Sequence, residues 1–175
     1  FLFLILAGSL VLNLVGVQYG LPDKCYPDEG RLVNHALAFG TGDLNPHYFH
    51  YPALCMYLLF IIYGIYFAAG YIAGVFQSTA DFQRLFFTDP SSFYLIGRIW
   101  VALTGTAVVA LVYRLGKEAF RSRKVGLVSA LFLAPLPYFV YYTHFIVTDQ
   151  LLLFFLLLSY LFILRIYRKG RLKDY

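Results

Sequence analysis

The stretch "VGLVSALFLAPLPYFVYYTHFIVTDQLLLFFLLLSYLFIL", residues 125–164, decides the fold, because its 40 residues carry one charged side chain, Asp149. At about 1.5 Å per residue a helix of this length is roughly 60 Å long, twice the ~30 Å hydrocarbon core of a bilayer. Backbone polar groups inside lipid must be hydrogen-bonded within their own segment. The stretch therefore predicts two membrane-spanning helices.

The two helices meet where polar residues gather. His144, Thr148 and Asp149 interrupt the apolar sequence, so we expect spanning helices at about 125–142 and 149–166. Further apolar runs at about 1–21 and 96–116 are also long enough to span.

The composition agrees with a membrane protein. The 175 residues are 61% hydrophobic, 20% aromatic and 13% charged, with a mean hydropathy of +0.70, which excludes an ordinary soluble domain. We predict an all-α, multi-pass transmembrane helical bundle. The chain has no initiator Met and starts within an apolar run, so we expect it to be a fragment, or one lobe, of something longer.

Basic residues predict the orientation. Ten of the 14 Lys and Arg residues form two clusters: Arg114, Lys117, Arg121, Arg123 and Lys124, then Arg165, Arg168, Lys169, Arg171 and Lys173. The positive-inside rule places both clusters in the cytoplasm. The turn with Asp149 and the loop 77–95 are then outside. The net charge of +5 comes from these clusters, which set the orientation in the membrane, and it indicates no nucleic-acid partner.

The run 52–76 has two interpretations. Its length favours a spanning helix, which would place the preceding loop inside the cell. Its many Tyr and Gly residues and its early Pro suit an interfacial or re-entrant helix, which would leave that loop outside. The charges do not decide between them.

That loop opens with "YPDEG", residues 26–30. The sequence 28–39 predicts a short amphipathic helix, since Leu32, Val33, Ala36, Leu37 and Phe39 recur at helical spacing. Gly40 is the expected C-terminal cap. Asp28 has two interpretations, an N-cap or a carboxylate at the membrane surface that accepts a proton from an attacking hydroxyl or amine. Glu29 would favour the helix dipole.

Other polar residues are also open to two interpretations. Asp149 lies between apolar residues and either faces a polar cavity or caps the following helix. Arg98 either extends its side chain to the interface or contacts a phosphate. His35, His47, His50 and His144 show no tight metal-ligand spacing, so a divalent metal stays open. Cys25 and Cys55 are too few for a disulfide framework.

No phosphate-binding glycine loop, GxSxG motif or cysteine zinc pattern is present in the sequence, which argues against a nucleotide-driven enzyme here. Two rivals to an enzyme remain. A transporter would use the intramembrane Asp and Arg for passage, and a non-catalytic membrane subunit would use the carboxylates only as caps.

Several segments occur in this chain in an order that resembles a known family of membrane enzymes. "YPDEG" is followed by "ALAFGTGDLNPHYFHYPAL" at 36–54, by "GRIWVALTGTAVVALVYRLGKEAF" at 97–120, and by the long apolar stretch quoted above. This set resembles the N-terminal part of the GT-C membrane glycosyltransferases. The branch it is most similar to holds the protein O-mannosyltransferases and the aminoarabinose transferase of lipid A (glycosyltransferase families 39 and 83).

The resemblance implies an enzyme that moves a sugar from a polyprenyl-phosphate donor to a protein, lipid or glycan acceptor outside the plasma membrane. It implies that 28–39 and 52–76 are juxtamembrane helices of the first outer loop. Asp28 matches the catalytic acidic position, Glu29 its neighbour and Asp149 a second acidic position, so the resemblance implies that all three are catalytic residues. Arg98 is the implied donor-phosphate contact. His47 and His50 are candidates for acceptor or metal contacts, and no cofactor beyond a possible divalent metal is implied.

Overall fold

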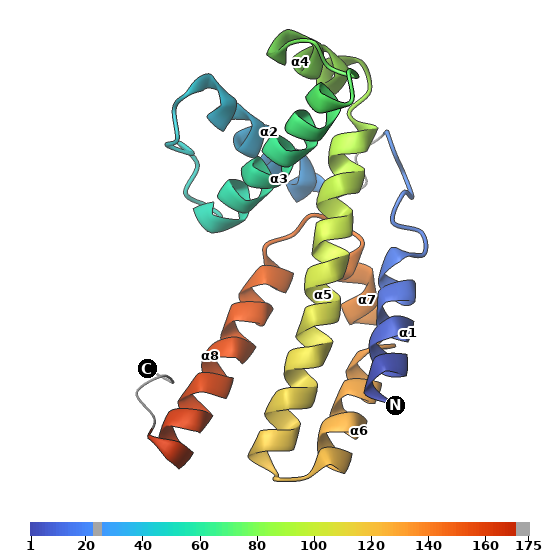
Figure 1. The fold of residues 1–175 in the computed structure, drawn as a ribbon, viewed down its shortest axis with the longest axis vertical. Coiled ribbons are helices and arrows are strands. Elements are labelled where there is room, and N and C mark those ends of the chain that lie inside the picture. Colours follow the sequence, from blue (N-terminus) through green and yellow to red (C-terminus); the bar gives the residue numbers. More distant parts are fainter. Residues whose placement is uncertain (23–25, 171–175) are drawn as a thin grey trace. The chain divides into compact units, whose positions relative to one another are not determined.

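The computed structural model describes residues 1–22 and 26–170, and all the regular elements in that part of the chain are helices (Figure 1). The elements are α1 Leu2–Leu14, α2 Pro27–Ala38, the short 3-10 helix η1 Phe39–Thr41, α3 Ala53–Ile72, α4 Thr79–Thr88, α5 Ser91–Ala119, α6 Arg123–Leu133, α7 Pro137–Thr143 and α8 Asp149–Lys169. The predicted all-α membrane bundle is confirmed. Lys24, Cys25, Arg171 and Lys173 lie outside the described residues.

The chain forms two compact units. The first, called the bundle unit, contains residues 1–16, 100–144 and 149–170 of the described chain. The second, called the loop unit, contains residues 17–99 and 145–148. The helix α5 begins in the loop unit and ends in the bundle unit.

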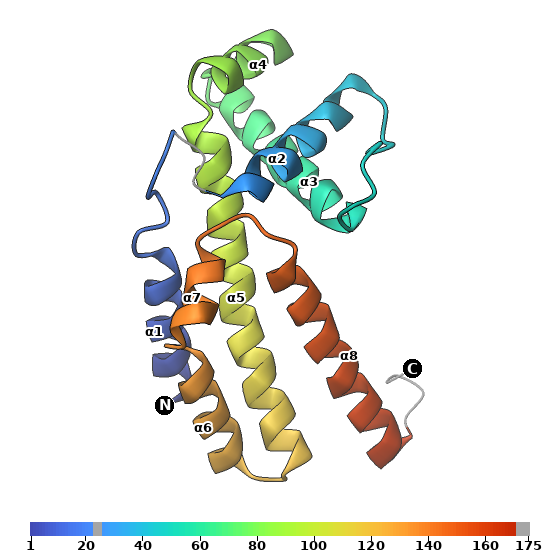
Figure 2. The same ribbon diagram turned by 180° about the vertical axis from the view of Figure 1, so that it is seen from behind.

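Apolar side chains from several helices fill the bundle unit. Its buried core consists of Val108, Val109, Tyr113, Ala130, Ala134 and Phe139. Leu6 of α1 and Phe154 of α8 pack against this core, and Figure 2 shows α1 running beside α6 and α7. Burial of this apolar surface is the main favourable contribution to the fold of the unit.

Two glycines let α5 and α6 approach closely. A Cβ atom on Gly126 would lie 2.6 Å from the Tyr113 carbonyl oxygen, and one on Gly116 would lie 3.2 Å from the Gly126 Cα. A side chain at Gly126 would push the two backbones apart.

The helix predicted over 125–142 is two helices in the structure. α6 and α7 meet at an angle of 68° across residues 134–136. Pro135 has no N–H to donate, and Pro137 is the first residue of α7, where that missing donor costs nothing. The prolines therefore break the apolar run well before residue 141.

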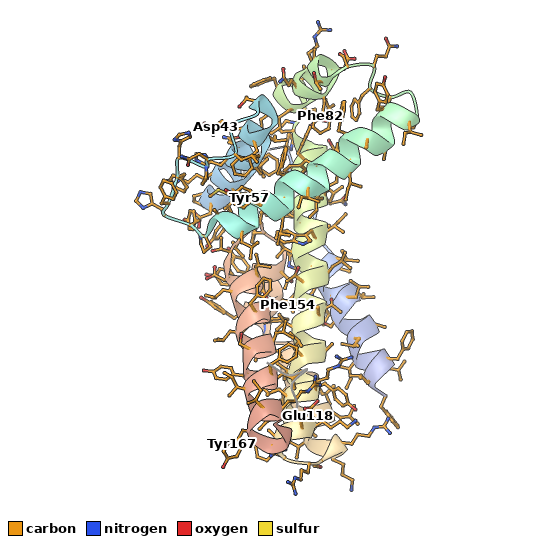
Figure 3. The ribbon with its side chains drawn as sticks, turned by 60° about the vertical axis from the view of Figure 1, so that its left-hand side comes forward. Asp43, Tyr57, Phe82, Glu118, Phe154 and Tyr167 are labelled. Carbon is orange, nitrogen blue, oxygen red and sulfur yellow. The ribbon has the colours of Figure 1, made fainter. Side chains whose placement is uncertain are left out.

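Two arginines of the second basic cluster bond to the C-terminal end of α5 within the bundle unit. Arg165 donates to both carboxylate oxygens of Glu118 at 2.6 and 3.0 Å, and Arg168 donates to the carbonyl oxygens of Glu118 and Ala119. Glu118 is labelled in Figure 3 near the end of α8. These bonds satisfy the last carbonyls of α5, and the cations suit the negative end of its dipole.

The loop unit is built on the predicted amphipathic helix. α2 buries Leu32, Val33 and Ala36, and Phe39 is buried directly after it. These side chains face α3, which α2 crosses. The positive-φ glycine that ends this segment is Gly42, with φ 96°, rather than the predicted Gly40, because η1 continues the chain for another turn.

Local signals position the rest of the loop unit. Ser78 and Asp81 form a reciprocal capping box at the start of α4. Gly74 follows α3 with φ 74°, and Val75 donates back to the Gly70 carbonyl, which resembles a Schellman ending.

Three described helices are long and apolar enough to cross a membrane: α3, α5 and α8. The bent pair of α6 and α7 passes the same test when it is counted as one span, and α1 is a shorter apolar helix. α3 thus meets the length criterion for spanning, while its juxtamembrane placement stays a prediction.

Candidate active site

The first turn of α2 carries two adjacent carboxylates in different surroundings. Tyr26 is the N-cap and Pro27 the first helical residue, so Asp28 and Glu29 both lie inside the first turn. Asp28 is therefore not the N-cap that local sequence allowed. Adjacent residues of a helix point about 100° apart, which directs one carboxylate inward and leaves the other near the surface.

Glu29 is the inward carboxylate, and its side chain is fully buried. Arg98, near the start of α5 and 1% exposed, pairs with it in a bidentate arrangement. The Nε–Oε1 and Nη2–Oε2 distances are both 2.7 Å. Two parallel N–H groups of the guanidinium match the two carboxylate oxygens in this geometry. The low dielectric constant of the interior strengthens the attraction between the two charges.

The same ion pair holds two further segments of the loop unit. Arg98 Nη1 donates to the carbonyl oxygens of Val17 and Tyr19 at 2.9 and 2.8 Å. The Ile146 N–H donates to Glu29 Oε1 at 3.0 Å. The Phe145 ring lies 5.4 Å from the guanidinium carbon. Four segments distant in sequence thus meet at one buried charge pair.

Arg98 was predicted to contact the donor phosphate. The structure places its guanidinium in the protein interior, where four of its five N–H groups are bonded to Glu29 and to backbone carbonyls. It is neither a snorkelling side chain nor one turned to solvent. Its contact with a phosphate stays a prediction.

Asp28 is the outward carboxylate, with 27% of its side chain exposed. Arg31, one turn later on α2, places Nη1 3.7 Å from Asp28 Oδ1. Hydrogen bonding of the Tyr51 hydroxyl to the Asp28 carboxylate raises the pKa of Tyr51 above its usual 10.0. A carboxylate with a cation and a phenol beside it, and with a free approach from solvent, suits acid–base chemistry.

Tyr51 belongs to a group of aromatic rings in the loop 42–52. Tyr48 stacks on His35 of α2, with ring centroids 4.7 Å apart. His50 and Tyr51 lie 5.1 and 5.7 Å from Tyr48 by the same measure. Such rings present apolar faces with polar edges, a surface that suits a sugar or a peptide side chain.

His47 lies in the same loop and pairs with Asp43, which Figure 3 labels. The Nε2–Oδ2 distance is 2.8 Å, and this bond lowers the pKa of the exposed Asp43 carboxyl. Among the described residues no group of three His, Cys, Asp or Glu side chains is close enough to hold a metal ion. The possible divalent metal stays open.

Asp149 lies in the bundle unit and is the first residue of α8. Its side chain is exposed. Cys55 is buried within α3 of the loop unit, and its possible partner Cys25 falls outside the described residues.

Sequence reasoning missed a buried polar cluster in the bundle unit. Asn13 of α1 donates to Ser9, to the Ala102 carbonyl and to Thr106, and Thr143 of α7 donates to Asn13 at 3.0 Å. A lone Asn within an apolar run was the available signal, because buried amides require hydrogen-bond partners.

Comparison with known proteins adds one finding. Residues 82–175, more than half of the chain, match the protein family described as dolichyl-phosphate-mannose-protein mannosyltransferase. The matched segment includes Arg98 and Asp149 but not Asp28 and Glu29. No curated protein and no solved structure matches the chain.

Proposed function

Because the chain belongs to the dolichyl-phosphate-mannose-protein mannosyltransferase family, a GT-C type of membrane glycosyltransferase, we propose that it moves a sugar from a polyprenyl-phosphate donor to an acceptor, with Asp28 as base. The sugar is a hexose or a pentose, and the acceptor is a protein, a lipid or a glycan. The reaction takes place on the outer face of the plasma membrane.

The observation that carries this proposal is the contrast between two neighbouring carboxylates. Glu29 is buried and bidentately bound to Arg98, so it is not available to a substrate. Asp28 is partly exposed, next to Arg31 and Tyr51. A base must reach the proton that it removes, and Asp28 meets that requirement while Glu29 holds the helix that presents it.

The proposed step is a single displacement. The Asp28 carboxylate accepts the proton of the acceptor hydroxyl, and the acceptor oxygen bonds to the anomeric carbon of the sugar. The bond from that carbon to the phosphate oxygen breaks, and the electron pair leaves with the polyprenyl phosphate. The leaving group is already stable as a phosphate, so a cation serves it better than a general acid.

Arg31 is the cation best placed for this purpose. Its side chain is 57% exposed, and it lies one turn from Asp28 on the same helix. A guanidinium can bind a phosphate through two parallel N–H groups. Arg98 is buried against Glu29, and we assign it to positioning of α2.

The remaining site residues are assigned by resemblance and by exposure. Asp149 is exposed at the start of α8, as a second acidic group of the reaction requires. His47 and His50 belong to the exposed loop beside Asp28, and we assign them to the acceptor side. The bonds from Arg165 and Arg168 to Glu118 and Ala119 join the ends of α5 and α8, which supports a shared cytoplasmic placement of the two basic clusters.

The test measures donor consumption in membranes that contain the protein. A radiolabelled polyprenyl-phosphate sugar is supplied with a crude acceptor extract, and wild type is compared with Asp28→Asn. Asp89→Asn is the matched control, since it changes another exposed carboxylate of the loop unit. We expect donor use to fall by about 10²-fold or more in Asp28→Asn only. Equal donor use by all three proteins at equal expression would exclude Asp28 as the base.

A further inference from the structure

The loop unit contains a cavity of about 740 Å³ that the proposed reaction does not use. It is bounded by the C-terminal half of α2, by η1, α3 and α4, and by the start of α5. Sites for small molecules have volumes of about 300–1,000 Å³. Asp28 and Glu29 belong to the first turn of α2 and do not line this cavity.

Seven of the fifteen residues that line the cavity are aromatic. They are Phe60, Tyr63 and Phe67 of α3, Phe82, Phe86 and Phe87 of α4, and Phe93 of α5. Phe82, labelled in Figure 3, has ring centroids 4.9 Å from Phe93 and 5.3 Å from Phe67. These edge-to-face contacts hold the rings in fixed orientations around the space. An apolar ligand therefore meets a preformed surface.

The polar residues of the cavity are all uncharged. Asn34, Thr41, Thr79 and Gln83 line it, and each is an exposed residue. None of the described residues lining the cavity is charged at neutral pH. Amides and hydroxyls can bind an alcohol or an ester, whereas a phosphate is bound more strongly where Lys or Arg is present.

The cavity also lies against a helix with a strongly apolar exterior. α3 exposes Ile61, Ile65 and Ile72, and it is long and apolar enough to cross a membrane. Phe87 of the cavity wall is 83% exposed. A hydrocarbon chain of the bilayer therefore has an apolar route to this space.

We propose that this cavity binds the apolar chain of a neutral lipid, with an uncharged hydroxyl or ester end held by the amides and hydroxyls of the rim. The site is separate from the proposed donor site, where a cation is needed for the phosphate. It does not depend on the proposed glycosyl transfer.

Two glycines allow the cavity to be filled without disturbing the fold. A Cβ atom on Gly64 of α3, or on Gly40 of η1, would meet no other atom within 4 Å. Because both glycines line the cavity, Gly64→Leu and Gly40→Leu add a side chain at its wall from two different elements. Ala69→Leu is the matched control, because Ala69 is exposed on α3 and does not line the cavity.

The experiment uses the purified protein in liposomes with three photoreactive diazirine probes: hexadecanol, a polyisoprenol and hexadecyl phosphate. Labelled peptides are located by mass spectrometry, and unchanged thermal stability shows that each variant is folded. We expect the neutral probes to label α3 and α4, and each Leu variant to lower that labelling by about tenfold, equivalent to ~1.4 kcal/mol. Ala69→Leu should retain it.

Labelling by either alcohol supports the site, and the ratio of the two identifies a linear or an isoprenoid chain. Equal labelling by hexadecyl phosphate would overturn the preference for a neutral lipid. Labelling of α3 and α4 that persists in both folded Leu variants would overturn the site itself. Donor use is not measured in this experiment, so its result is distinct from that of the Asp28 test.

Discussion

The two units of the molecule bury polar groups in different ways. In the loop unit the buried pair Glu29–Arg98 is ionic, and it holds four segments together. In the bundle unit the buried cluster around Asn13 is neutral and joins α1, α5 and α7. A buried charge without its partner is far more costly than a buried amide without its own. The contrast therefore predicts different sensitivities to substitution.

The largest effect is expected from Arg98→Met, which leaves the Glu29 carboxylate buried without its cation. We expect a loss of about 3–5 kcal/mol in the free energy of unfolding. Thermal unfolding of the purified protein in detergent measures it. Glu29→Met combined with Arg98→Met should recover part of the loss, because no charge is then buried. A double variant less stable than Arg98→Met would contradict the ionic interpretation.

A smaller effect is expected where the neutral cluster is packed tightly. A Cβ atom on Gly105 would lie 2.5 Å from Thr143 Cγ2 and 3.3 Å from Asn13 Nδ2. Gly105→Ala should cost about 1–3 kcal/mol through displacement of Thr143. Gly8→Ala on α1 is the control, since its Cβ meets nothing within 4 Å. It should be neutral or stabilising by up to about 1 kcal/mol. Equal stability of the two variants would show that Thr143 and Asn13 can move to accommodate the added methyl group at little cost.

A still smaller effect is expected from Asn13→Leu. Thr143 keeps its bond to the Val140 carbonyl, and Thr106 keeps its bond to the Ala102 carbonyl. Because these hydroxyls are not left without partners, the loss should be only about 1 kcal/mol. The same unfolding measurement checks it. A loss as large as that of Arg98→Met would remove the distinction between the two clusters.

The smallest effect on stability is expected at Asp28, the partly exposed carboxylate, rather than at the buried Glu29. The Tyr51 pKa is raised by its bond to Asp28, so this bond contributes stability below pH ~10 and loses it as pH rises through the raised value. The difference between the absorbance titrations of wild type and Tyr51→Phe should show one tyrosine that ionises above the usual pKa of 10.0. Tyr48→Phe is the control. A Tyr51 that ionises with the exposed tyrosines would mean that the hydroxyl does not hold Asp28.

Much of the fold was predictable from the periodicity of apolar residues. The stripe of Leu32, Val33 and Ala36 predicts which face of α2 is buried, because a helix repeats every 3.6 residues. The bend at Pro135, which lies inside the helix predicted over 125–142, was not predicted. Hydropathy measures how apolar a run is, and it carries no information about a change of direction within that run.

The partner of Glu29 was not predictable in the same way. Glu29 and Arg98 were both selected as site residues, but 69 positions separate them in the chain. Residue type indicates that a buried carboxylate requires a cation, and only the tertiary structure shows which cation reaches it. The cluster of Asn13 and Thr143 was not predicted for the same reason, since these residues are 130 positions apart in the chain. The roles of Asp28 and Asp149 in a reaction stay predictions.

Asp28 and Glu29 are neighbours on one helix, so the rotation of α2 about its axis decides which of the two carboxylates faces Arg98. A one-residue insertion between Pro27 and Asp28 would rotate the pair by about 100°, and Asp28 would then take the place of Glu29 opposite Arg98. The Asp side chain is one methylene shorter than that of Glu, so the bidentate hydrogen bonding to the guanidinium would be lost. Glu29 would then point away from Arg98. The order of the two letters in "DE" is therefore as meaningful as their presence, and "ED" at the same positions would not be an equivalent sequence.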